Sequence, residues 1–508
     1  MMRTCQSTRS ARAIRPSSQN SSLILRQVKH KRLSNRIKVR CQLLGGQAAY
    51  GAGARGLRSC HRFSASKLLA EPLPHGGGRM TTEIAVLNRL GIALATDSAV
   101  TVGGPANTKV FNSADKLFEL TCDYPVAVMI NGNTDCAGIP WELIVKDFRE
   151  SQGKQSRKTI ADWATDLLSF AQARVKPISE SDEQYVTNTA IAEIEYIKDD
   201  ILQRLWDSGL SFDAARGLVR EVSEQRTEEL LRRGISASHA DMSIDDLTKQ
   251  YASVLAKLIA EGLSPIEIDE TETNAVMTQI VTSMLSLSPA DSLTGLIVAG
   301  YGETDMFPSV SSIDLAGMAF RKIKCSSIKD RAIVGSSKGG HVVSFAQNDV
   351  IERLLGGADP RLTSKVADFI VEIFGKFGQT LTEIAGKKRA SKTERDNRDE
   401  AISELTKAAK DEYITAAKEM QDDFKIEFER MIAMMPKIEL IEFAEALVNI
   451  TAIERKATTD QGTVGGPIDV AFVSKHEGFV WIKRKFYFPA ALNPRYFWRK
   501  FHVGRTED

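Results

Sequence analysis

The chain has 508 residues, 43% of them hydrophobic, and its 67 Lys and Arg residues nearly balance 65 Asp and Glu residues, giving a formal net charge of +2. This length is ample for one large core with helical insertions. No run of about 18 apolar residues occurs, so we expect no contact with a membrane. The few cysteines show no pairing pattern, which is typical of a reducing interior and predicts a cytoplasmic protein.

Residues that bind metals or phosphates are scarce. After Met80 the four His and three Cys residues are widely scattered and lack the spacing of metal ligands. No Gly-rich loop of the Walker or dinucleotide-binding form appears. The sequence therefore predicts neither a metal nor a cofactor.

Residues 1–80 form a basic leader that we exclude from the fold. It is rich in Arg and Ser, and with Glu71 as its only acid it carries about +15, which leaves about −13 for the rest. It fits an organellar transit peptide, a propeptide removed before Thr81, or upstream sequence translated from a start codon placed too early. Met80 favours the last, because initiation there followed by loss of Met would free Thr81. The lack of interleaved aromatics disfavours a nucleic-acid-binding arm.

Near-continuous runs of small and branched apolar residues fill the stretch from Thr81 to Gly132. Such runs, broken by Gly and Asn, predict strands buried on both faces. They indicate a hairpin that turns near Gly91, followed by strands at 109–111 and 126–130. The few polar residues stand at strand starts and ends, where a site can form: Thr81, Asp97, Lys109 and Asn131.

The order of these residues resembles the proteasome β-subunits and the bacterial proteasome-type peptidases, which are N-terminal-nucleophile (Ntn) hydrolases. In that family a Thr opens the chain, an Asp follows sixteen residues later, and a Lys begins the third strand. Asp97 stands sixteen residues after Thr81, and Lys109 fits the family's Lys after a shortened loop. Residues 129–135 resemble the family's Met-Ala-Gly-Gly-Ala-Ala-Asp, with Asn131 where a Gly is usual. An ordinary ion pair would explain Asp97 or Lys109 alone, whereas the ordered set favours the family.

The resemblance implies a role for each residue. A Thr hydroxyl is a weak nucleophile, and a free α-amine with a pKa near 8 would act as its base. Lys109 would favour deprotonation of the Thr81 hydroxyl through its positive field, and Asp97 would pair with Lys109. Backbone N–H groups at Asn131 and Gly132 would donate to the oxyanion. The nucleophile must be the first residue of the mature chain. Thr82 in that place would leave the spacing to Asp97 one residue short.

Helical periodicity dominates residues 151–289, which we predict to be a helical insert longer than the family's usual two-helix layer. An apolar stripe in residues 247–259 starts after Ser243 and ends at Gly262 and Pro265. Its charged faces are typical of solvated helices, and a surface for a partner is the alternative.

Strands return at 293–301, 308–317, 333–337 and 344–347. The resemblance implies that a Gly-Ser segment supplies a hydroxyl near the nucleophile. Ser336, Ser337 and Ser344 are the candidates, and the sequence does not choose among them. A plain helix N-cap would explain any one of them. Residues 377–445 alternate basic and acidic side chains, which predicts long solvated helices with i,i+4 pairs within the core span.

A closing hairpin is predicted at 469–473 and 479–482, after a turn that contains Asp460 and Thr463. The resemblance implies that these two side chains lean on the nucleophile's amine, whereas a turn that satisfies backbone groups is the other interpretation. Residues 483–508 form an aromatic and basic tail.

We therefore predict an α+β fold, a four-layer α-β-β-α sandwich of two mainly antiparallel sheets, with its core at 81–150 and 290–482. The resemblance implies a threonine-type endopeptidase with Thr81 as nucleophile, acting on polypeptides in a homo-oligomeric ring with a separate ATPase. The alternatives are an inactive assembly or binding subunit and a small-amide amidohydrolase. We expect neither a nucleic acid nor a membrane as a partner.

Overall fold

A computed structural model gives the fold of the chain. It describes residues 82–102, 109–209, 214–264, 266–287, 293–335, 339–346, 349–386, 392–458 and 465–502. These residues divide into two compact units. One holds Asp182–Ile235 and Asp241–Ser286, and the other holds both large sheets together with Ser236–Ala240. The predicted leader and Thr81 lie outside the described residues.

The first sheet has five strands in the order β13-β1-β2-β14-β15, and its pairings are antiparallel. The predicted first hairpin is confirmed, with a turn at Arg89 and Leu90. Gly91 is required there, because a Cβ would lie 2.5 Å from the Val473 carbonyl oxygen. The closing hairpin is confirmed as well. The strands are β1 (Thr82–Asn88), β2 (Gly91–Thr96), β13 (Gly340–Ala346), β14 (Asp469–Ser474) and β15 (Gly478–Lys483).

The second sheet follows the order β11-β10-β9-β6-β5, and β12 pairs with β10. Its pairings are also antiparallel. The strands are β5 (Leu117–Glu119), β6 (Val126–Gly132), β9 (Leu293–Gly300), β10 (Ser309–Ala319), β11 (Lys322–Cys325) and β12 (Lys329–Ile333). Two small ribbons pair β3 (Val100–Val102) with β4 (Lys109–Phe111) and β7 (Asp135–Cys136) with β8 (Ile139–Pro140).

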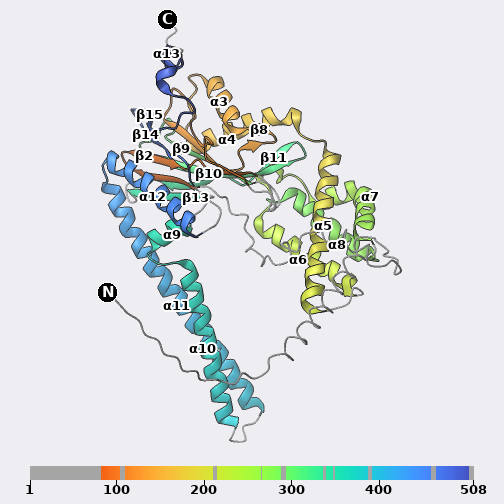
Figure 1. Ribbon diagram of the computed structural model, residues 1–508. Helices are drawn as coiled ribbons and strands as arrows, with labels where there is room; N and C mark the ends of the chain where they lie inside the picture. The colour runs from red at the N-terminus through yellow and green to blue at the C-terminus, as the bar shows by residue number, and fades with distance from the viewer. Residues whose placement is uncertain are drawn as a thin grey trace, which may run out of the picture. The chain divides into compact units, whose positions relative to one another are not determined.

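Three apolar clusters hold this unit together. One joins facing side chains of the two sheets, among them Leu87 and Leu94 of the first and Met129 and Ile297 of the second. Helices cover the outer faces (Figure 1), with α3 (Trp141–Gln152) and α4 (Ile160–Val175) on the second sheet. On the first sheet lie α9 (Asp349–Gly356), α11 (Lys392–Met434) and α12 (Lys437–Thr458). The fold class is therefore α+β with antiparallel sheets.

The rest of this unit consists of one long helix and short pieces. Helix α10 (Pro360–Gly386) packs against α11. The charged segment predicted to be helical lies in these helices and in α12, which confirms its helical structure. The tail carries α13 (Pro494–His502), whose Tyr496 and Phe497 pack edge-on against Phe488 and Phe486. Three short 3-10 helices are η2 (Lys176–Ile178), η4 (Ala237–His239) and η5 (Ala490–Leu492). No helix in the described part of the chain has the length and apolarity needed to cross a bilayer.

The helical unit is built from α5 (Asp182–Ser208), α6 (Ala215–Arg233), α7 (Ile244–Leu263) and α8 (Glu270–Leu285). Its interior contains a charged pair, in which Arg226 Nε lies 3.4 Å from Glu193 Oε2 and both side chains are nearly fully buried. Gln279 Nε2 and Ser283 Oγ also donate to the Glu193 carboxylate, at 2.8 and 2.7 Å. Burial opposes the charge on Arg226, yet Glu193 and Glu229 raise its pKa above the ordinary value.

We predict that Glu193→Gln lowers the free energy of unfolding by about 2 kcal/mol, because it removes one of the two carboxylates that pair with the buried Arg226 and leaves only Glu229. The matched control is Glu228→Gln, which removes an exposed pair 3.8 Å from Arg232 and should cost less than about 1 kcal/mol. Chemical denaturation of both variants measures the difference. Equal costs would show that the buried pair does not stabilise the helical unit.

Candidate functional site

Asp97 lies at the end of β2, where its side chain is fully buried and accepts four hydrogen bonds. Its Oδ1 accepts from the Thr82 backbone N–H at 3.2 Å and from Lys116 Nζ at 2.7 Å. Its Oδ2 accepts from the backbone N–H groups of Ala99 and Gly465, at 3.2 and 3.0 Å. A carboxylate with four donors is well satisfied in the interior. Asp97 therefore ties together the start of β1, the end of β2 and the segment that leads into β14.

The partner of Asp97 is Lys116, which directly precedes β5 of the second sheet. Its side chain is only 3% exposed, and its Nζ also lies 3.8 Å from Glu83 Oε1 of β1. Two buried carboxylates thus surround one buried ammonium, and the three groups come from both sheets. A buried charge is tolerated only when it is paired in this way, so the cluster joins the sheets at the start of β1.

Side chains alternate strictly along β1. The odd-numbered Ala85 and Leu87 pack in the cluster between the sheets, whereas the even-numbered Ile84 and Val86 pack toward the helices on the outer face. Glu83 belongs to the odd series and faces Lys116. Thr82 belongs to the even series, and its buried Oγ1 has no hydrogen-bond partner. The lysine thus faces the odd-numbered side of the strand.

Lys109 is not part of this cluster, and the predicted pair between Asp97 and Lys109 is wrong. Lys109 begins the small exposed strand β4, and its ammonium lies 4.7 Å from the centre of the Phe111 ring. The physical reason is burial, because Asp97 needs a counter-charge from a residue that enters the core. Lys116 does so, as it precedes a strand whose Leu117 and Phe118 are buried.

A missed signal could have identified Lys116 from the sequence. It stands before Leu117-Phe118-Glu119-Leu120, an apolar stretch that leads toward the 126–130 strand. A single cation at the start of a buried strand has to find an anion inside the fold. Lys109 was selected instead, because it fits the position of the lysine in the proteasome-type family. The role of Glu83 was missed because it was counted only as one residue of an apolar strand.

Asn131 and Gly132 end strand β6, next to the segment that carries Lys116. The Ile130 N–H donates to the Lys116 carbonyl at 2.9 Å, which brings Asn131 close to the lysine along the backbone. Asn131 is buried, and its Oδ1 has no hydrogen-bond partner. Gly132 adopts a φ of +79°, and a Cβ there would lie 2.0 Å from the Leu293 carbonyl oxygen. Only glycine fits at that position.

The other predicted site residues are placed less fully. Thr81, Ser336, Asp460 and Thr463 lie outside the described residues, as does Ser337. Ser344 lies in β13 opposite Ile84. Gly465, which follows the segment with Asp460 and Thr463, reaches Asp97 through its N–H. Within the described ranges, no group of three or more His, Cys, Asp or Glu side chains is arranged to hold a metal ion.

Cys136 is the thiol nearest to this end of β6 along the chain. It is buried, and burial together with the nearby Asp135 raises its pKa to about 12. The reactive form of cysteine is the thiolate, so a thiol with this pKa stays protonated and inert at neutral pH. Cys136 is therefore a core residue rather than a nucleophile.

No protein-family model matches the chain, and no curated protein matches it. Among solved structures, the chain matches one from the helical assembly of the Anbu complex of Pseudomonas aeruginosa. That match has 11% sequence identity and a TM-score of 0.24, and it covers 84% of this chain and 98% of that one. A likeness at this score carries no argument about fold or function.

These findings overturn the family assignment made from the sequence. A proteasome β-subunit or a bacterial proteasome-type peptidase would bring a family model or a curated relative with it, and neither is found. The assignment rested on a few residues at strand ends, and one of them, Lys109, lies outside the site. The assignment is wrong, and the function has to be argued from the geometry of the cluster.

Removing Lys116 should destabilise the fold. We expect Lys116→Met to lower the free energy of unfolding by about 3 kcal/mol, because Asp97 and Glu83 lose the ammonium between them. Lys109→Met removes an exposed cation–π contact and should cost about 1 kcal/mol or less. Urea denaturation compares the two variants. A larger cost for Lys109→Met would contradict the assignment of Lys116 as the buried counter-charge.

The thiols of Cys122 and Cys136 should differ in reactivity. In the folded protein at pH 8, iodoacetamide should modify the exposed Cys122 and leave Cys136 unmodified, because the pKa of Cys136 lies well above that pH. Peptide mapping by mass spectrometry reads each site separately. After unfolding in urea both should react, and early alkylation of Cys136 in the folded chain would refute its burial.

Proposed function

We propose that this protein hydrolyses amide bonds with Thr81 as an N-terminal nucleophile, as a threonine-type peptidase. The observation that supports the proposal is the Glu83–Lys116–Asp97 cluster at the start of β1. A buried cation held by two carboxylates beside a strand end is a costly arrangement for stability alone. Buried charges that are held by specific partners occur often at functional sites.

The alternation of β1 supports Thr81 over Thr82. We propose that the alternation continues to residue 81, which would then join the odd-numbered Glu83, Ala85 and Leu87 that face the second sheet and the lysine. The Thr82 hydroxyl belongs to the other series. In the proposed site the nucleophile therefore shares a strand face with Glu83, and Asp97 fixes the backbone of the next residue through the Thr82 N–H.

The chemistry follows from these positions. The α-amine of residue 81 takes the proton of its own hydroxyl, and Oγ forms a bond to the carbonyl carbon of the substrate. The ammonium of Lys116 takes the role predicted for Lys109. Its positive charge stabilises the deprotonated (alkoxide) form of the Thr81 hydroxyl. The C–N bond then breaks, and the amine leaves with the transferred proton. Water hydrolyses the ester, which restores the hydroxyl.

The fold suits this proposal. We propose that the two facing sheets and their outer helices form a four-layer α-β-β-α sandwich. The substrates would be polypeptides, with a homo-oligomeric ring and a separate ATPase as predicted from the sequence. An amidohydrolase for small amides would use the same nucleophile. A chain that keeps residues before Thr81 would serve instead as an assembly or binding subunit.

We predict that the native protein begins at Thr81 and that an epoxyketone forms an adduct there. N-terminal sequencing and intact mass determine the start, and peptide mapping locates the adduct. Thr81→Ala should abolish both the adduct and peptide hydrolysis, whereas the neighbouring Thr82→Ala should retain the adduct. A native chain that keeps Met80, or an adduct that persists in Thr81→Ala, would exclude the proposed nucleophile.

A further inference from the structure

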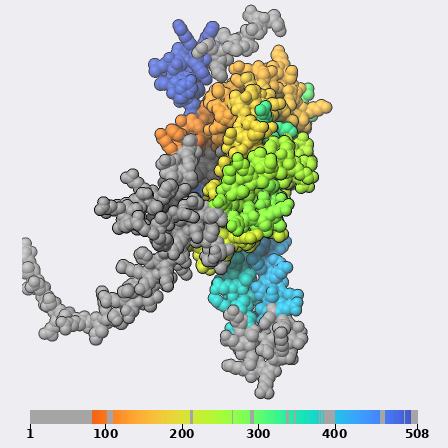
Figure 2. Space-filling view, turned by 90° about the vertical axis from the view of Figure 1, so that its right-hand side faces the viewer, coloured from red at the N-terminus to blue at the C-terminus, as the bar shows by residue number. Residues whose placement is uncertain are grey.

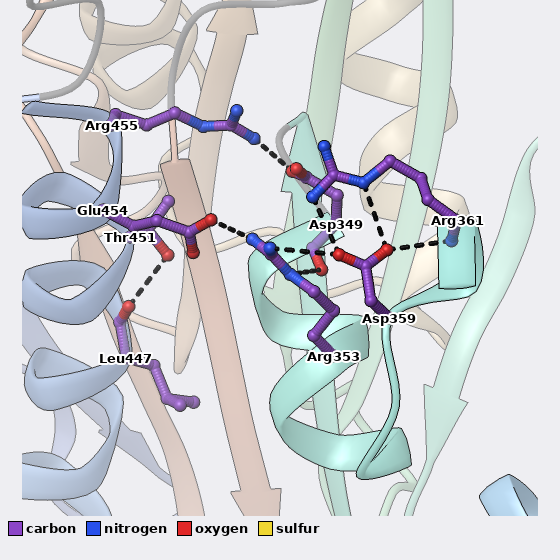
Figure 3. Close-up of polar contacts among 8 residues, drawn as sticks. All are labelled: Asp349, Arg353, Asp359, Arg361, Leu447, Thr451, Glu454 and Arg455. Atoms are coloured by element: carbon purple, nitrogen blue, oxygen red, sulfur yellow. Dashed lines mark hydrogen bonds and ion pairs between the residues drawn. The ribbon is translucent and has the colours of Figure 1, made fainter. Parts of the chain in front are cut away.

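Helices α10 and α11 form a long hairpin that extends away from the two sheets (Figure 1). Arg353 of α9 pairs with Asp359 before α10, at 3.3 Å, and with Glu454 of α12 (Figure 3). Arg455 of α12 pairs in turn with Asp349. Hydrogen bonds from Arg361 hold the pKa of Asp359 well below its usual range. This network fixes the direction in which α10 leaves the core.

One face of α10 packs against α11. Ala367 is 2% exposed, and Gly378 comes so close that a Cβ would lie 2.8 Å from Ile402 Cγ2. Ile370 and Phe374 are partly buried toward the same side, whereas the partly buried Val366 lies within the arc of the exposed stripe described next. This contact accounts for only part of the apolar surface of α10.

A second apolar stripe on α10 is open to solvent. At 3.6 residues per turn its five members fall within an arc of about 80°. Figure 2 shows described parts of both hairpin helices at the surface. The exposed fractions are large for side chains of this type: Leu362 58%, Phe369 58%, Ile373 46%, Phe377 57% and Ile384 62%. A contiguous apolar stripe of this length marks an interaction surface.

The stripe is palindromic. Phe369 and Phe377 each lie four residues from Ile373, and Leu362 and Ile384 each lie eleven residues from it. Two copies of α10 that run antiparallel across a two-fold axis at Ile373 would therefore pair each of these five exposed side chains with another of the five. Leu362 would meet Ile384 of the partner subunit, and Phe369 would meet Phe377 of the partner subunit. A two-fold interface requires such self-complementarity.

A pair of opposite charges beside the stripe is centred one residue away from Ile373, at position 374. Glu372 and Lys376 lie on one flank, where they pair with each other within the helix, and their side chains are 59% and 70% exposed. In the antiparallel arrangement, Glu372 comes opposite Lys376 of the partner subunit within two residues of the apolar register. Opposite charges at the flanks set the orientation of helix pairs.

We propose that the α10 stripe is a homodimer interface, occupied by α10 of a second copy in antiparallel orientation about Ile373. The palindromic spacing and the flanking pair favour a second copy over an unrelated protein, which has no reason to match a two-fold pattern. The flank mixes both signs of charge, whereas a helix that binds anionic lipid presents a basic face. The interface is independent of the proposed hydrolase activity.

Sedimentation velocity and native mass spectrometry of the full chain at micromolar concentration test this interface. We expect Ile373→Glu, which brings two like charges together at the axis, to weaken association at least about tenfold. The matched control is Ile414→Glu on α11, which replaces an Ile of similar exposure (41%) on the same hairpin and should leave the mass unchanged. Circular dichroism verifies that both variants are folded.

Charge reversal tests the register. Glu372→Lys and Lys376→Glu should each weaken the dimer, and the double variant should restore it. An added cysteine at Ile373→Cys should form a covalent dimer on oxidation beyond any formed by the parent chain, whereas Ile414→Cys should not. A monomeric wild-type chain, or an Ile373→Glu variant with the association of the wild type, would overturn the proposal.

Discussion

The buried ammonium of Lys116 is the interaction on which the site depends. It lies 2.7 Å from Asp97 and 3.8 Å from Glu83, two carboxylates of the first sheet, and it enters from the start of a strand in the second. The apolar cluster between the sheets holds them together, but hydrophobic contacts are not directional and do not set their alignment. The charged cluster sets the alignment of the two sheets at the start of β1. Because an unpaired charge in this interior is costly, the start of β1, the end of β2 and the start of β5 must meet.

Several neighbouring features follow from that constraint. The Gly465 N–H donates to Oδ2 of Asp97, so the segment before β14 is held at the same end of the sheet. The Lys116 carbonyl accepts from Ile130, which aligns β6 with the lysine and places Asn131 and Gly132 beside it. The alternation of β1 puts Glu83 on the lysine's side of the strand and Thr82 on the opposite side. One ion cluster therefore determines how these three strand ends meet.

The sequence predicted the parts of the fold that local pattern controls. The first and last hairpins were found because Gly91 and Gly478 interrupt apolar runs, and the long helices were found from their periodicity. Lys109 was chosen because it matched the family spacing, whereas the burial of the strand after Lys116 is what carries that lysine into the core. Glu83 was overlooked for the same reason. The family assignment failed because it rested on the spacing of a few residues at strand ends. Such spacing is set by the local hairpin and is not specific to one protein family.

The central claim is that Lys116 activates the hydroxyl of Thr81. The most direct measurement is the single-turnover rate of acylation of Thr81 in a folded Lys116→Met variant, compared with wild type and Lys109→Met. The account predicts a loss of about 100-fold for Lys116→Met, the size typical of one electrostatic group removed from an active site, and no change for Lys109→Met. Acylation of Lys116→Met at the wild-type rate would contradict it.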